Sequence, residues 1–80
     1  MAKPKTRVVN SIRDLRAERG MTQQDLADAI GMTRQTIIAI EQGKYSPSLE
    51  VAFQIAQVFG VGLDDVFHYG PNPHDQETPK

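Results

Sequence analysis

Residues 23–42 read QQDLADAIGMTRQTIIAIEQ, and this stretch decides the fold. Its apolar side chains recur at the three- and four-residue spacing of helices that bury one face. They are Leu26, Ile30, Met32, Ile37 and Ile40. Gly31 lies between the two halves, and glycine adopts the positive φ of a sharp turn without steric cost. The stretch therefore predicts two short helices that meet at a tight corner.

Capping residues and one small residue support this corner. Thr22 and Asp25 have the spacing of a capping box at the start of the first helix, and Thr33 can cap the second. Ala27 is small enough to let the two helices approach closely, and Gly43 ends the second helix. Two short helices joined in this way are typical of a helix-turn-helix.

Three further helices are expected around this pair. The first runs from Asn10 to about Gly20, the second from Leu49 to about Phe59, and the last is one turn from Leu63 to Phe67. The sequence thus predicts an all-α, compact five-helix domain over residues 8–69. Residues 1–7 are expected to form a flexible basic tail and residues 70–80 a flexible polar one.

The helix from Leu49 to Phe59 is apolar around most of its circumference. One stripe carries Leu49, Ala52, Phe53, Ala56 and Phe59, and a second carries Val51, Ile55 and Val58. Helices of this kind are buried on more than one side. This helix is therefore either the centre of the domain or partly an interface.

Composition limits the classes of protein that fit. With 80 residues and 39% apolar residues, the chain forms one domain with a modest core, and without cysteine it has no disulfides or cysteine-based zinc site. No run is long enough for a transmembrane helix, and the start MAKPKTR lacks the apolar region of a signal peptide. We expect a cytoplasmic protein without a membrane partner.

Charge is distributed unevenly along the chain. The net charge is −1, which is unusual for a protein that binds nucleic acid. Residues 1–44, however, hold eight basic side chains against five acidic ones, whereas residues 45–80 hold only Lys80 against five acidic ones. A polarised domain of this kind can present a positive face to phosphates.

The helix after the corner carries side chains that read base edges in the major groove of DNA. Arg34 can donate two hydrogen bonds to a guanine, and Gln35 can pair with an adenine in the same bidentate way. Ala39 and Ile38 could contact a thymine methyl group, although Ile38 is equally well explained as an exposed apolar residue. Contacts to the DNA backbone are expected at the helix starts and in the following loop. They involve Gln23, Thr33, Thr36, Lys44, Tyr45 and Ser46.

Arg16 and Glu41 form a second pair of interest, one late in the first helix and one late in the third. We expect a salt bridge that fixes the motif to its scaffold. Arg16 could instead face a phosphate.

Four motifs of the chain resemble, in their order and spacing, those of the Cro/C1-type (xenobiotic-response-element) family of helix-turn-helix DNA-binding proteins. The resemblance is strongest to the short single-domain repressors of that family. The four motifs are IRDLRAERGMTQQDLA, GMTRQTI, IEQGKYSPSLE and GVGLDDVF. The resemblance implies a lambda-repressor-like fold and a homodimeric repressor on an inverted repeat. It also implies that residues 7–9 and 67–69 pair as a small antiparallel sheet. Ile38 and Ala39 depart from the family pattern, so base preference does not transfer.

A different class of function uses the second stripe of residues 49–59. An antitoxin-like, protein-binding module would hold a foreign protein there, whereas a repressor would use such apolar positions to bind its own copy. Candidate residues for that dimer interface are Val51, Ile55, Val58, Leu63 and Val66. An enzyme is not expected, because Asp64 and His68 have no accompanying third ligand or nucleophile. Neither a metal nor a cofactor is expected.

Overall fold

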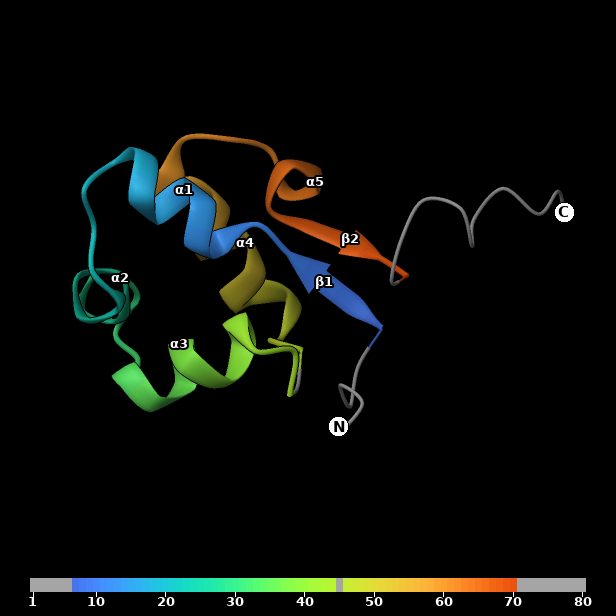
Figure 1. Ribbon diagram of the computed structural model, residues 1–80, viewed down its shortest axis with the longest axis horizontal. Helices are drawn as coiled ribbons and strands as arrows, with labels where there is room; N and C mark the ends of the chain where they lie inside the picture. Colours follow the sequence, from blue (N-terminus) through green and yellow to red (C-terminus); the bar gives the residue numbers. More distant parts are fainter. Residues whose placement is uncertain (1–6, 45, 71–80) are drawn as a thin grey trace, which may run out of the picture.

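Helices build the core of the molecule, and a short two-stranded sheet closes it on one side (Figure 1). The computed structural model describes residues 7–44 and 46–70. The elements in chain order are β1 (Val8–Asn10), α1 (Ile12–Glu18), α2 (Gln23–Ile30), α3 (Arg34–Glu41), α4 (Leu49–Phe59), α5 (Leu63–Val66) and β2 (Phe67–Tyr69). The predicted five helices and small sheet are confirmed. The tails expected at residues 1–7 and 70–80 lie almost wholly outside the described residues.

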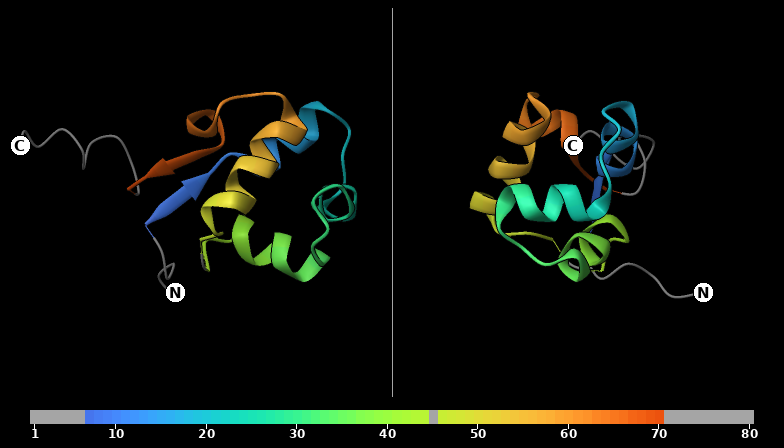
Figure 2. Two further views of the ribbon diagram at one scale, coloured as in Figure 1. Left: turned by 180° about the vertical axis from the view of Figure 1, so that it is seen from behind. Right: turned by 90° about the vertical axis from the view of Figure 1, so that its left-hand side faces the viewer.

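The longest helix, α4, crosses the middle of the molecule between α1 and α3 (Figures 1 and 2). Figure 2 also shows α2 and the sheet at opposite sides of the molecule. The core joins these elements through six large side chains with less than 2% exposure. They are Ile12, Leu26, Ile37, Ile40, Ile55 and Val66. Because they come from α1 to α5, every helix contributes to one core.

The corner between α2 and α3 has the predicted geometry. Gly31 takes the left-handed conformation with φ of 70°, and Ala27 is fully buried at 0% exposure where α3 packs on α2. The N–H of Met32 donates to the Ala27 carbonyl at 2.9 Å and completes the turn. Thr22 and Asp25 form the reciprocal capping box, and the Thr33 side chain caps α3. Local chemistry thus fixes both helix starts.

Helix α4 is buried differently from the expectation. Leu49 and Phe53 are 66% and 52% exposed, whereas Ile55 is fully buried at 0%. Ile55 and Val66 cannot form a dimer interface in this fold, because both lie in the core without exposed surface. Val51 and Val58 are half-buried and pack against that core. The continuous open stripe on which an antitoxin-like function depended is therefore absent.

The sheet pairs β1 with β2 in antiparallel fashion, with Val9 opposite His68. The first strand covers Val8–Asn10 and not the expected residues 7–9, because pairing continues to Asn10 opposite Phe67. Beyond the strand, the Arg7 carbonyl still accepts from the Gly70 N–H at 2.7 Å. Among the described helices, none is long and apolar enough to cross a bilayer.

The packing at Ala27 gives a stability prediction. Ala27→Leu should lower the free energy of unfolding by about 1–3 kcal/mol, because a larger side chain has no room between α2 and α3. Ala29→Leu is the matched control, since Ala29 lies on the same helix but is exposed. Urea unfolding followed by circular dichroism measures both. Equal midpoints for the two variants would show that α3 does not depend on close approach at Ala27.

Candidate nucleic-acid interface

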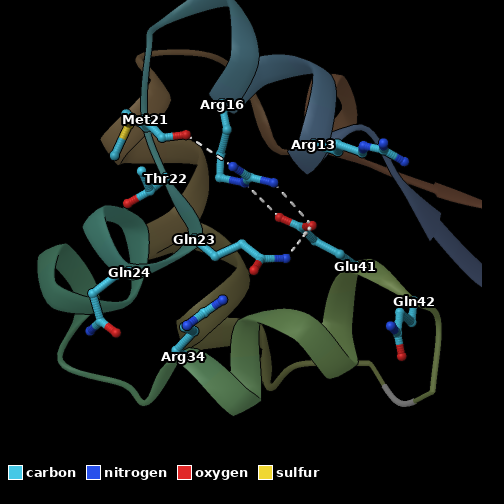
Figure 3. Close-up of a pocket in the computed structure, with 9 residues that line it drawn as sticks. All are labelled: Arg13, Arg16, Met21, Thr22, Gln23, Gln24, Arg34, Glu41 and Gln42. Atoms are coloured by element: carbon cyan, nitrogen blue, oxygen red, sulfur yellow. Dashed lines mark hydrogen bonds and ion pairs between the residues drawn. The ribbon is translucent and has the colours of Figure 1, made fainter.

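A polar cleft of about 810 Å³ lies between α1, the start of α2 and α3 (Figure 3). Most of its lining side chains carry hydrogen-bonding groups. The lining residues are Arg13, Arg16, Met21, Thr22, Gln23, Gln24, Arg34, Glu41 and Gln42. The cleft therefore joins the helix that starts the domain to both helices of the corner.

The ion pair expected between Arg16 and Glu41 lies in this cleft. Arg16 Nε donates to Glu41 Oε2 at 2.7 Å and Nη2 donates to Oε1 at 3.3 Å. Arg16 Nη1 also donates to the Met21 carbonyl at 2.9 Å, which holds the loop between α1 and α2. The two side chains are only 15% and 9% exposed, so water screens this pair weakly. It connects α1 to the end of α3.

Gln23 belongs to the same network, which the sequence did not predict. Its Nε2 donates to Glu41 Oε1 at 3.2 Å, and the residue is half-buried. Within residues 7–44 and 46–70 this is the amide's hydrogen bond, so one N–H and the oxygen are open to a further partner. A pairing across 18 residues leaves no local signal in the sequence, so only the folded structure reveals it.

Two arginines supply positive charge that the cleft does not neutralise. Because Glu41 compensates Arg16, the remaining cationic side chains of the lining are Arg13 and Arg34. Both residues are exposed, and neither has a hydrogen bond or ion pair within residues 7–44 and 46–70. Sequence reasoning passed over Arg13. Its position three residues before Arg16 on one helix would have placed both on the same face.

The first turn of α3 is open to solvent beside the cleft. Arg34 and Gln35, the two proposed guanine- and adenine-reading residues, are exposed, while Ile38 and Ala39 one turn later are half-buried. In Figure 3 the Arg34 side chain extends from the start of α3 into the cleft. Ile38 therefore lies between core and solvent and is not fully exposed.

Most of the residues expected to contact the DNA backbone lie at the two ends of α3. Thr33 Oγ1 accepts from the Thr36 N–H at 3.3 Å and lies 3.0 Å from Thr36 Oγ1. The two hydroxyls are therefore hydrogen-bonded to each other at the start of α3. Lys44 and Ser46 are exposed just beyond the helix end. Tyr45 lies outside the described residues. These groups flank the exposed face of α3 at its two ends.

Comparison with known proteins agrees with this geometry. The family described as Helix-turn-helix matches residues 12–66. An HTH-type transcriptional regulator of Methanocaldococcus jannaschii is 55% identical over 60 residues, which cover 75% of this chain and 91% of that protein. The transcriptional repressor RstR of the cryptic phage CTXphi in Vibrio cholerae is 39% identical over 57 residues, covering 71% of this chain and 51% of RstR.

A solved structure resembles the fold as well. The restriction-modification controller protein C.AhdI of Aeromonas hydrophila superposes with a TM-score of 0.64 at 26% identity, covering 68% of this chain and 82% of C.AhdI. The superposition extends over most of both chains.

The weakly screened ion pair gives a second prediction. Glu41→Gln should lower the free energy of unfolding by about 1.5–3 kcal/mol, because Arg16 then keeps a mostly buried charge without its carboxylate. Glu18→Gln breaks the ion pair with Arg19, in which Glu18 is 68% exposed. That control should cost less than about 0.5 kcal/mol. Chemical denaturation compares the two, and equal losses would contradict a structural role for the Glu41 carboxylate.

Proposed function

Because the chain belongs to the Cro/C1-type helix-turn-helix family of transcriptional regulators, we propose that it is a sequence-specific repressor that binds double-stranded DNA as a homodimer. Its operator is an inverted repeat, and it acts in the cytoplasm on the nucleoid. The carrying observation is the exposed first turn of α3 beside a cleft with two uncompensated guanidinium groups, those of Arg13 and Arg34.

Helix α3 has the dimensions of a major-groove reader. With eight residues at about 1.5 Å each it is roughly 12 Å long, so its first turns alone reach the base edges. Arg34 pairs with a guanine and Gln35 with an adenine in this proposal. Ile38 and Ala39, half-buried one turn later, contact a thymine methyl group in this proposal.

Phosphates of the DNA backbone are bound around α3. Arg13 lies on the α1 side of the cleft and supplies a full positive charge. The amide of Gln23 has one N–H free beside it, and Thr33 and Thr36 lie at the start of α3. Lys44 and Ser46 bind phosphate at the other end of the helix. Contacts of this kind fix register and affinity without reading sequence.

Homodimer formation needs an apolar surface that the monomer leaves open. Leu49 and Phe53 provide one, since they are 66% and 52% exposed and lie one helical turn apart on α4. Large apolar side chains exposed together mark interaction sites more often than single ones do. Val51, Val58 and Leu63 are half-buried and add smaller surfaces to the proposed interface. Repression follows if the dimer occupies DNA that the transcription machinery needs, and the relative RstR is itself a transcriptional repressor.

Replacing the two free arginines should separate base reading from phosphate binding. Arg34→Ala should cost about 1–3 kcal/mol of binding free energy and relax preference at one base position. Arg13→Gln should weaken all sequences alike and reduce the slope of log affinity against log salt by about 0.9. Fluorescence anisotropy with duplexes selected from a random library by the wild-type protein measures both effects. Two variants with the same specificity profile would contradict this division, and a wild-type affinity independent of salt would contradict DNA binding through the cleft.

The dimer proposal is tested at α4. Phe53→Lys should shift the protein from dimer to monomer in size-exclusion chromatography with light scattering, because a charge would be buried in the apolar interface. Ala17→Lys adds the same charge at an exposed position of α1 and should leave the dimer intact. A wild-type protein that is monomeric at micromolar concentration, alone and on DNA, would rule out the homodimer.

A further inference from the structure

The side chain of Asn10 joins three elements that are distant in sequence. Asn10 is the last residue of β1, and its Oδ1 accepts from the Ile12 N–H at 3.1 Å at the start of α1. Its Nδ2 donates to the Ile40 carbonyl of α3 at 2.9 Å, across 30 residues. One carboxamide therefore holds the sheet, the first helix and the end of α3 together.

The chemistry of the two partners explains why the residue is an asparagine. Ile12 offers an N–H and Ile40 offers a carbonyl oxygen, so the side chain between them must both accept and donate. Ser11, the N-cap residue of α1, makes no side-chain capping bond to this helix, and Asn10 accepts from the N–H of its first residue instead. An aspartate would keep the first bond but place a negative oxygen against the Ile40 carbonyl.

Support for α3 differs between its two ends. Its start packs on α2 at the corner, whereas its last turn buries Ile40 in the core and is also held by polar side chains of other elements. One attachment is the ion pair from Arg16 to Glu41, and another is the hydrogen bond from Asn10 to Ile40; Gln23 of α2 adds a third through Glu41. The first reaches α3 from α1 and the second from β1, so together they restrict its tilt in two directions.

We infer that Asn10 is a positioning residue for DNA recognition: its carboxamide fixes the tilt of α3 relative to the sheet, and so the direction in which Arg34 and Gln35 face the groove. This inference rests on the proposed function. Without the bond to Ile40, α3 samples other tilts, and the apparent affinity falls in proportion to the population that still fits DNA. Asn10 is neutral and binds no phosphate, so its loss leaves the salt dependence unchanged.

The decisive variant is Asn10→Ser. A serine hydroxyl can still accept from the Ile12 N–H, as in turns that serine forms with its own backbone, but it ends one bond short of the Nδ2 position and cannot reach Ile40. Affinity for the duplex selected with the wild-type protein should fall about 3- to 10-fold, as expected for one lost neutral hydrogen bond. The salt slope should equal that of the wild type, unlike the slope of Arg13→Gln. Asn10→Asp should show at least the same loss.

Leu15→Ala is the control for stability. Leu15 is a neutral, half-buried residue of α1 that packs on the core, and it does not line the cleft. At a temperature at which all variants are folded, this control should bind the duplex within two-fold of wild type, even if it unfolds more easily than Asn10→Ser. If affinity instead follows melting temperature across the three proteins, Asn10 has a structural role only and the inference is wrong.

A measurement without DNA separates this inference from the proposed function. Residual dipolar couplings of the backbone amides report the orientation of α3 relative to β1 and β2. In Asn10→Ser these couplings should change for α3 and stay unchanged for α4, whereas in Leu15→Ala the orientation of α3 should stay as in wild type. An unchanged α3 orientation in Asn10→Ser overturns the positioning role, whether or not the wild type binds DNA. Absence of DNA binding by the wild type overturns the proposed function and the recognition role of Asn10 with it.

Discussion

The carboxylate of Glu41 is the point on which the arrangement of the first three helices depends. It accepts hydrogen bonds from Arg16 and Gln23, and Arg16 in turn holds the Met21 carbonyl in the connecting loop. One acidic side chain at the end of α3 thus fixes α1, the loop after it and the start of α2. Its charge also decides which arginines of the cleft remain without a neutralising partner among the described residues. Because Glu41 compensates the charge of Arg16, the proposed phosphate binding depends on Arg13 and Arg34, which no other side chain within residues 7–44 and 46–70 pairs with.

This dependence on polar attachments follows from what α3 has to expose. A helix of eight residues is not stable alone in water, and tertiary packing must hold it. The face that could meet DNA cannot be buried, which leaves Ile37 and Ile40 as its fully buried apolar side chains. Hydrogen bonds and an ion pair at the end of the helix supply the remaining restraint without covering its outer face. They are directional as well, so they define an orientation better than apolar contacts do.

Features determined within one or two turns of the chain were predictable from the sequence. The capping box at Thr22, the left-handed Gly31 and the inward positions of Ile37 and Ile40 each follow from residue type and local spacing. Of the side-chain pairings over long separations, the one between Arg16 and Glu41 was expected, and the others were not. The bonds of Gln23 to Glu41 and of Asn10 to Ile40 bridge 18 and 30 residues, and many other polar side chains could have formed them.

The apolar residues of α4 show a related limit. Both stripes of this helix are apolar, so periodicity alone cannot decide which of their residues face the core. Ala52, Ala56 and Phe59 of the first stripe and Ile55 of the second do so. Packing of α2 and α5 against α4 accompanies the burial of Ile55, whereas Leu49 and Phe53 stay exposed. Local composition does not decide the register of the sheet either. A shift of one residue in β1 changes no composition. In the structure Asn10, the last residue of the strand, lies opposite Phe67, and its side chain bonds to α1 and α3.

The net charge of a chain is likewise a poor guide to the class of molecule that it binds, because net charge ignores where the charges lie. The chain carries a formal charge of −1, yet Asp64 and Asp65 lie on α5, on the far side of α4 from α3 (Figure 1). At physiological ionic strength, interactions between exposed charges fall off over about 8 Å. A phosphate in the cleft therefore interacts mainly with Arg13 and Arg34 and little with α5. For a domain this polarised, the charges within one screening length of the proposed interface decide whether it attracts DNA.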